Sequence, residues 1–205
     1  KIAATLDGRT TLPDGRSQWR TGEAAREDVQ RWRARSAAIL TGIGTVLADD
    51  PALTVREAGQ PLPVQPLRVI LDSRYRTPPT ARILARPGEV LVFGAGADRR
   101  GAEPGALLSR GALVEAAPDD AGRVDLAAML RRLGELEVNE VWVEAGPALN
   151  GALLAAGRID ELVVYQAASV LGGTARGMFD MAAPADLGAR PRFRLQEARR
   201  VGEDL

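Results

Sequence analysis

Short apolar runs alternate with helical segments along the whole chain, and this alternation constrains the fold more than any other feature. Strands are expected at residues 2–6, 37–41, 67–72, 89–93, 112–116, 140–144 and 161–167. Runs such as Val69-Ile70-Leu71 are continuously apolar, which is typical of strands buried on both faces. The sequence therefore predicts an α/β fold, with a mostly parallel central sheet and helices on both faces.

The segments between the strands carry helix-start signals. Thr21 is expected to cap a helix that runs to about residue 35, and Asp125 to cap a helix that runs through Leu136. Pro147 suits the first position of a third helix, which ends near Gly157. The Gly/Pro-rich stretches 57–66 and 99–105 are short enough to be surface loops, so residues 1–205 are predicted to form one domain.

The chain contains neither histidine nor cysteine. This excludes disulfides, thiolate nucleophiles, Ser-His-Asp triads and zinc or iron–sulfur sites with these ligands, and no metal site is expected. Chemistry must then come from carboxylates, hydroxyls, backbone amides or a bound cofactor.

The charges and the hydropathy exclude further classes. Lys plus Arg and Asp plus Glu both number 27, so no net charge favours binding of nucleic acid. No apolar run reaches about 18 residues, and no signal-peptide pattern opens the chain. We expect a cytoplasmic protein that does not bind a membrane.

One strand runs directly into a small-residue turn and a helix start, at Glu144-Ala145-Gly146-Pro147-Ala148-Leu149-Asn150-Gly151. Unpaired backbone N–H groups and the positive end of the helix dipole suit a pyrophosphate at such a turn. The segment is neither a G-x-G-x-x-G nor a Walker motif. A tight turn without a ligand remains the alternative interpretation.

The stretch 41–51 repeats this arrangement, with glycines at 42 and 44 and the pair Asp49-Asp50 before a proline. We expect a helix of barely one turn, with Thr45 at its start and with Thr45 and Asp49, four residues apart, on one face. The alternative is a turn in which the two acids only end the helix.

Two other strand ends carry weaker signals. Ser73 and Arg74 follow the strand 67–72, and a hydroxyl beside a guanidinium suits the 2′-phosphate of a ribose. Gly94-Ala95-Gly96 follows the strand 89–93 without a third glycine, so it is predicted to be a loop.

Several ungapped motifs together resemble one known family. They span residues 1–9, 17–22, 33–42, 44–56, 69–73 and 143–147, and include Lys1-Ile-Ala-Ala-Thr-Leu-Asp-Gly-Arg9, Val69-Ile-Leu-Asp-Ser73 and Val143-Glu-Ala-Gly-Pro147. In this order they are similar to the reductase domain of the bacterial riboflavin-biosynthesis deaminase-reductase, in the dihydrofolate-reductase-like superfamily. The resemblance covers most of the chain.

The resemblance implies an oxidoreductase. Its NADPH-dependent reaction reduces the phosphoribosylamino side chain of a 5-aminouracil to the ribityl form, by hydride transfer to the ribose C1′. The family's deaminase half uses a zinc site of His and Cys, so this chain is expected to hold only the reductase half. Fusion to a deaminase in the full-length protein and a homodimer are also implied.

The resemblance also assigns residues to the cofactor and to the substrate. Cofactor positions, with Arg74 added from the strand-end argument, are Ala3, Trp19, Thr45, Asp49, Ser73, Arg74, Gly146, Pro147, Ala148, Leu149, Asn150, Gly151 and Ala152. Substrate positions are Ser17, Arg33, Leu53, Arg56 and Glu144. Of these, Asp49 and Glu144 are the candidates for a direct role in catalysis.

Two other functions stay open from the sequence. One is a reductase of the same fold that acts on a different pyrimidine or on a pterin. The other is a nucleotide-binding module without catalysis. Arg33 and Arg56 favour a phosphorylated small-molecule substrate, because forked guanidiniums match phosphate oxygens.

Overall fold

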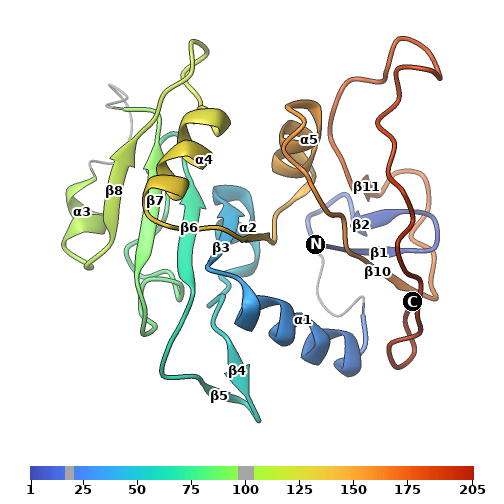
Figure 1. Ribbon diagram of the computed structural model, residues 1–205, viewed down its shortest axis with the longest axis horizontal. Helices are drawn as coiled ribbons and strands as arrows, with labels where there is room; N and C mark the ends of the chain where they lie inside the picture. The colour runs from blue at the N-terminus through green and yellow to red at the C-terminus, as the bar shows by residue number, and fades with distance from the viewer. Residues whose placement is uncertain (17–20, 97–103) are drawn as a thin grey trace. The chain divides into compact units, whose positions relative to one another are not determined.

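The computed structural model describes residues 1–16, 21–96 and 104–205. The chain forms two compact units, of which the first combines Lys1–Asp28 with Gly146–Leu205 and the second spans Val29–Ala145. The division falls inside helix α1, Glu23–Arg35, which matches the helix predicted up to residue 35. Figure 1 traces both units along the chain.

The second unit contains a five-stranded sheet whose paired strands are all parallel, in the order β8-β7-β6-β3-β9 (Figure 1). The strands are β3 (Ala38–Gly42), β6 (Leu67–Leu71), β7 (Val90–Gly94), β8 (Leu113–Ala116) and β9 (Val141–Val143). The central strands β3, β6 and β7 are almost entirely buried, as their continuous apolar runs indicate. The predicted α/β fold with a mostly parallel sheet is therefore confirmed.

Helices α2 (Ile43–Asp49), α3 (Gly105–Leu108) and α4 (Leu126–Glu135) lie in the same unit. Asp125 caps α4 as predicted, because its carboxylate accepts hydrogen bonds from the backbone N–H groups of Ala127 and Ala128 at 2.8 and 3.0 Å. Helix α3 was not predicted. Among the described helices of the chain, none is long and apolar enough to cross a bilayer.

Helix α2 corrects the expectation of barely one turn beginning at Thr45. It has seven residues, nearly two turns, and begins at Ile43. Gly42 serves as its N-cap in an extended conformation, so the helix starts directly where β3 ends.

The stretch 57–66, predicted to be a plain loop, contains part of a hairpin. Strands β4 (Arg56–Glu57) and β5 (Gln60–Pro61) are antiparallel, and the turn residues Ala58 and Gly59 have φ values of 46° and 81°. Two positive φ values in succession are typical of the type I′ turn. An alanine at the first turn position is unusual, and this hid the hairpin from sequence analysis.

The described residues of the first unit include two small sheets and helix α5, besides the start of α1. Strand β1 (Ile2–Thr5) pairs in parallel with β10 (Val164–Ala167), and β2 (Arg9–Thr11) pairs antiparallel with β11 (Arg176–Gly177). Strand β10 is shorter than predicted, and the two- and three-residue strands β11 and β2 were too short to be recognised. Helix α5 (Pro147–Ala155) begins with Pro147 at its first position, as expected.

Arg68, on the central strand β6, is fully buried. Its Nη1 donates to the carbonyl oxygen of Ile83 at 2.7 Å, and its Nη2 to those of Arg86, Pro87 and Gly88 at 2.7–3.0 Å. Burial lowers the pKa of this guanidinium from its usual value. Arg68 thus attaches the irregular segment before β7 to the middle of the sheet.

Candidate active site

The strand order reverses between β3 and β9, since β6, β7 and β8 extend the sheet from one side of β3 and β9 joins the other. Ligands of open parallel sheets bind outside the carboxyl ends of the strands at such a reversal. Glu144 immediately follows β9 there. Its N–H donates to Leu40 on β3 at 2.9 Å, and the Thr41 hydroxyl donates to its carbonyl oxygen at 2.8 Å.

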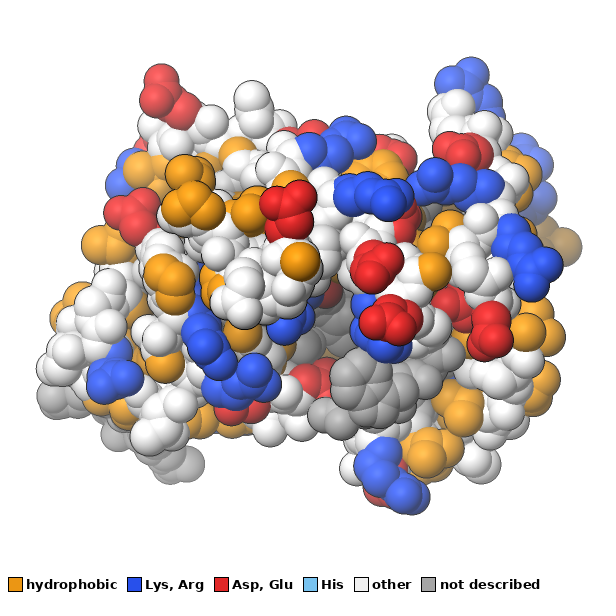
Figure 2. All heavy atoms as spheres, turned by 90° about the horizontal axis from the view of Figure 1, so that it is seen from below, with side chains coloured by type: hydrophobic (Ala, Val, Ile, Leu, Met, Phe, Trp, Pro, Cys, Tyr) orange, Lys and Arg blue, Asp and Glu red, His pale blue; other side chains and the backbone are white. Residues whose placement is uncertain are grey.

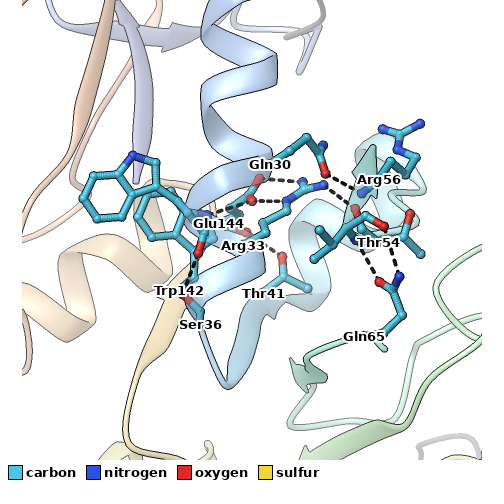
Figure 3. Close-up of polar contacts among 11 residues, drawn as sticks. Gln30, Arg33, Ser36, Thr41, Thr54, Arg56, Gln65, Trp142 and Glu144 are labelled. Atoms are coloured by element: carbon cyan, nitrogen blue, oxygen red, sulfur yellow. Dashed lines mark hydrogen bonds and ion pairs between the residues drawn. The ribbon is translucent and has the colours of Figure 1, made fainter. Parts of the chain in front are cut away.

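The Glu144 carboxylate is held by Arg33 of α1 (Figure 3). Arg33 Nε lies 2.6 Å from Glu144 Oε1, and Arg33 Nη2 lies 2.9 Å from Oε2, so the pair is bidentate. The two side chains are only 11% and 14% exposed. Burial alone would lower the pKa of Arg33, but the charge and hydrogen bonds of Glu144 raise it.

A second group reaches the same carboxylate. The indole N–H of Trp142, on β9, donates to Glu144 Oε1 at 2.9 Å. The Trp142 ring stacks on Trp32 of α1, with centroids 5.1 Å apart and planes 8° apart. The Arg35 guanidinium lies 4.6 Å from the centroid of the Trp32 ring. Glu144 therefore accepts N–H groups from one cation and one packed aromatic ring.

The segment after α2 is tied to helix α1 by side chains. Arg33 Nη1 donates to the Thr54 carbonyl at 3.0 Å, and the Arg56 N–H donates to Gln30 Oε1 at 2.9 Å (Figure 3). Leu53 is buried and has a φ of 46°, which is strained for a leucine. The structure thus joins Arg33 directly to Glu144 and ties the segment that carries Leu53 and Arg56 to α1 through backbone groups of Thr54 and Arg56.

Arg56 differs from Arg33 in its surroundings. Arg56 is exposed on the hairpin strand β4, and its guanidinium forms no ion pair among the described residues. Three of the five N–H groups of Arg33, by contrast, donate to Glu144 and Thr54. The structure therefore leaves Arg56 better able than Arg33 to offer a complete guanidinium fork to an anion.

Thr45 and Asp49 both lie on α2, four residues apart and half-buried, so they share one face of the helix. The end of the helix is made by their neighbour Asp50, which has a left-handed conformation and whose N–H donates to Val46. The Asp50 carboxylate accepts the N–H of Arg82 at 2.8 Å. Asp50 therefore fills the structural role that the alternative interpretation gave to the acid pair.

Ser73 and Arg74 lie just beyond β6, next to the buried Asp72. The Asp72 carboxylate accepts the N–H and the hydroxyl of Thr77 at 2.7 and 2.8 Å, which fixes the turn. The Ser73 hydroxyl oxygen accepts the N–H of Val124 at 3.2 Å, so its own proton can be donated elsewhere. The Arg74 residue is exposed.

The remaining cofactor positions belong to the first unit. Ala3 lies on β1. Residues 147–152 form the N-terminal part of α5, and Gly146 is its N-cap, so no side-chain hydrogen bond caps the helix. Gly151 packs against the backbone of Asp180, since a Cβ there would lie 2.1 Å from the Asp180 carbonyl oxygen. The side chain of Asn150 also donates to Met178 at 3.3 Å. Ser17 and Trp19 fall outside the described residues.

Sequence analysis missed Trp142 as a member of this site. A signal was present, because side chains two apart on a strand point to the same face, and Trp142 precedes Glu144 by two. The carbonyl of Thr54 had no such signal, since a backbone acceptor has no characteristic residue type.

Acidic and basic side chains of the described residues are intermixed on the face shown in Figure 2. This agrees with the equal numbers of the two charge signs. Recognition of an anion would then depend on individual guanidiniums rather than on a broad field.

Comparison with known proteins identifies relatives over the whole chain. The riboflavin biosynthesis protein RibD of Escherichia coli is 44% identical over 215 residues, covering 100% of this chain and 57% of that protein. The 5-amino-6-(5-phosphoribosylamino)uracil reductase of Buchnera aphidicola (subsp. Acyrthosiphon pisum) is 30% identical, covering 95% of this chain and 96% of that protein.

A solved structure of RibD from Acinetobacter baumannii superposes with a TM-score of 0.86 at 39% identity, covering 99% of this chain and 54% of the other. This chain thus spans about half the length of the RibD proteins that it matches. The family model for the RibD C-terminal domain matches residues 1–205. The chain belongs to the RibD C-terminal domain family.

Proposed function

We propose that this chain is the reductase that converts 5-amino-6-(5-phosphoribosylamino)uracil to its phosphoribitylamino form in riboflavin biosynthesis, with NADPH as the cofactor. The observation that carries the proposal is the buried, bidentate pair of Arg33 and Glu144 beside the reversal of strand order. The Buchnera reductase, which this chain matches over 96% of that protein's length, supports the same reaction.

The substrate would be held at two ends. The Glu144 carboxylate suits the N–H groups of the pyrimidine, because an ionised carboxylate only accepts hydrogen bonds. The exposed fork of Arg56 suits the phosphate. Arg33, most of whose donors serve Glu144 and Thr54, would fix the carboxylate and present its remaining N–H groups to the substrate.

The donor set also fits a phosphorylated nucleotide. The uncapped N-terminus of α5 leaves the N–H groups of Ala148 and Leu149 without partners within the helix, which suits a pyrophosphate. The proton of the Ser73 hydroxyl and the exposed guanidinium of Arg74 suit a ribose 2′-phosphate. This supports NADPH rather than NADH.

The reaction needs little acid or base chemistry from the protein. The ribosylamine opens to an imine, hydride adds to C1′, and a proton adds to the nitrogen to give the ribitylamine. A bound nicotinamide supplies the hydride. Thr45 and Asp49, on one face of α2, would orient the reacting groups, and orientation can lower the barrier by several kcal/mol. This agrees with a chain that contains no histidine.

Mixing the purified protein with NADPH and the phosphoribosylamino substrate tests the proposal. We expect loss of the absorbance of reduced nicotinamide and a product heavier by one hydride and one proton. NADH should be about ten- to a hundredfold less efficient, because it lacks a charge-assisted contact to Ser73 and Arg74. Turnover of a pterin but not of this substrate would instead support the other reductase, and binding of NADPH without any turnover would support a non-catalytic module.

Replacing Arg56 with alanine should raise the KM for the phosphorylated substrate at least about tenfold, because the phosphate loses its bidentate cation. The KM for NADPH should stay unchanged. Arg110→Ala, which removes another exposed arginine, is the matched control. The assignment fails if Arg56→Ala weakens NADPH instead, or if it weakens a dephosphorylated substrate to the same extent.

The partners of the full-length enzyme are a proposal separate from its substrate. A deaminase domain fused to this chain and a homodimer remain proposals, supported by the share of the RibD proteins that this chain spans and by the family resemblance. Size-exclusion chromatography with light scattering on the full-length protein measures the second of these.

A further inference from the structure

The side-chain amide of Gln65 binds both backbone polar groups of Val55, the residue before Arg56. Its Oε1 accepts the Val55 N–H at 2.8 Å, and its Nε2 donates to the carbonyl oxygens of Val55 and Leu62 at 3.0 and 2.7 Å. The Leu62 N–H also donates to the Val55 carbonyl at 3.0 Å, which extends the β4–β5 hairpin by one pair. Gln65 thus makes the hydrogen bonds that a neighbouring strand would otherwise make, directly before the strand that carries Arg56.

Side chains bind the outer ends of the same two peptide groups (Figure 3). The Thr54 carbonyl oxygen accepts Arg33 Nη1 at 3.0 Å, and the Arg56 N–H donates to Gln30 Oε1 at 2.9 Å. Together with the two bonds from Gln65, these contacts bind all four polar groups of two successive peptides. Because a peptide group is planar, fixing two successive planes fixes the φ and ψ of the residue between them. The backbone that leads into Arg56 is therefore held in one orientation.

The Gln65 side chain is itself held by packing against Gly88. A Cβ at Gly88 would lie 2.8 Å from Gln65 Cβ, and the φ of Gly88 is 100°, so this close approach requires glycine. The Gly88 carbonyl in turn accepts Nη2 of the buried Arg68 at 2.7 Å. The Gln65 amide also has one satisfactory orientation, because its oxygen faces an N–H and its nitrogen faces two carbonyls.

We propose that Gln65 and Gln30 are positioning residues, which hold the backbone on either side of the Val55–Arg56 peptide and thereby present the Arg56 guanidinium to the phosphate of the substrate. This inference rests on the proposed function, in which Arg56 binds that phosphate. Neither glutamine touches the substrate or the cofactor, and both act through Arg56. A fixed backbone reduces the conformational entropy that the exposed Arg56 side chain loses when it binds an anion. Loss of either glutamine should therefore weaken the phosphate contact more than the chemical step.

Gln65→Leu tests the proposal, because leucine roughly keeps the volume of the side chain and removes its amide. We expect the KM for the phosphorylated substrate to rise about three- to tenfold. The KM for NADPH, the KM for a dephosphorylated substrate and kcat should stay within about twofold. Gln30→Leu, which removes one hydrogen bond at an exposed position, should raise the same KM about two- to fivefold. Gln60→Leu is the matched control, since Gln60 is an exposed glutamine on β5 of the same hairpin, and it should leave all these constants within about twofold.

A double-mutant cycle with Arg56→Ala separates the positioning of Arg56 from a general loosening of the hairpin. The phosphate contact is already lost in Arg56→Ala, so adding Gln65→Leu should change the KM by less than about twofold. Where Gln65→Leu does not fold, the milder Gln30→Leu decides the same question in the same cycle.

The inference is overturned if the effects of Gln65→Leu and Arg56→Ala multiply, or if Gln65→Leu weakens a dephosphorylated substrate to the same extent. It is also overturned if Gln65→Leu and Gln30→Leu both behave as wild type. Each of these results presupposes a wild-type protein that turns over the phosphoribosylamino substrate. Absence of turnover in the wild-type protein would instead contradict the proposed function.

Discussion

Replacing Arg33 with methionine is expected to lower the free energy of unfolding by about 3 kcal/mol, because it leaves the Glu144 carboxylate largely buried without its charged partner. The same variant should reduce kcat/KM for the substrate at least about a hundredfold, since the carboxylate loses the bidentate contact that fixes its position. Urea denaturation and steady-state kinetics measure the two effects separately.

The double variant Arg33→Met/Glu144→Leu distinguishes stability from function. Removing both charges should restore much of the free energy of unfolding, because no unpaired buried charge remains. Activity should stay lost. Arg35→Met, which breaks the more exposed pair with Glu140, should cost no more than about 1 kcal/mol. Equal losses for Arg33→Met and Arg35→Met would contradict the importance of the buried pair.

Replacing Arg68 with methionine is expected to lower the free energy of unfolding by about 3 kcal/mol or more. Methionine roughly fills the space, but four backbone carbonyls lose a donor, and an unsatisfied buried group costs about 1–3 kcal/mol. Arg68→Lys should be intermediate, because an ammonium has three donors and no planar fork. Urea denaturation again provides the measurement.

Arg86→Ala is the matched control for Arg68, because the Arg86 side chain is exposed while its carbonyl, an acceptor of Arg68, is kept. It should change the free energy of unfolding by no more than about 0.5 kcal/mol. If Arg68→Met were as mild as this control, then the segment before β7 would not depend on the buried guanidinium.

Arg68 also shows which features of the fold cannot be predicted from the sequence alone. The run at β6 was recognisable as a buried strand because Val69, Ile70 and Leu71 are continuously apolar. Nothing local indicated that Arg68 would be buried with them. Its acceptors are backbone carbonyls 15–20 residues further along the chain, and such acceptors carry no residue signature.

Two of the three predicted helix starts were correct, whereas α1 begins at Glu23, one residue later than a cap at Thr21 predicts. The cap at Asp125 and the proline at the start of α5 follow from local hydrogen bonding and from the fixed φ of proline. Features that depend on an unusual conformation were missed, as with the hairpin turn at Ala58. The length of α2 was underestimated because an extended Gly42 could serve as its N-cap without a side chain.

The candidate site, too, was predicted in part and missed in part. The family motifs placed Arg33 and Glu144 on the substrate side, and the structure joins them directly. That they bind each other, and that Trp142 completes the carboxylate's shell, depends on the packing of α1 against β9. The family motifs identified the participants but not their partners, because pairing between distant segments is a property of the folded chain.

The stacked pair Trp32 and Trp142 gives this part of the molecule a spectroscopic signal. Two indoles whose centroids are 5.1 Å apart are close enough for their excited states to couple, so the pair contributes to the circular dichroism and the fluorescence of the folded protein. Since Trp142 also donates to Glu144, a ligand that moves the carboxylate changes the electrostatic field at one of the two chromophores. The protein thus carries an intrinsic optical reporter beside its candidate substrate site, and titrations there need no attached dye.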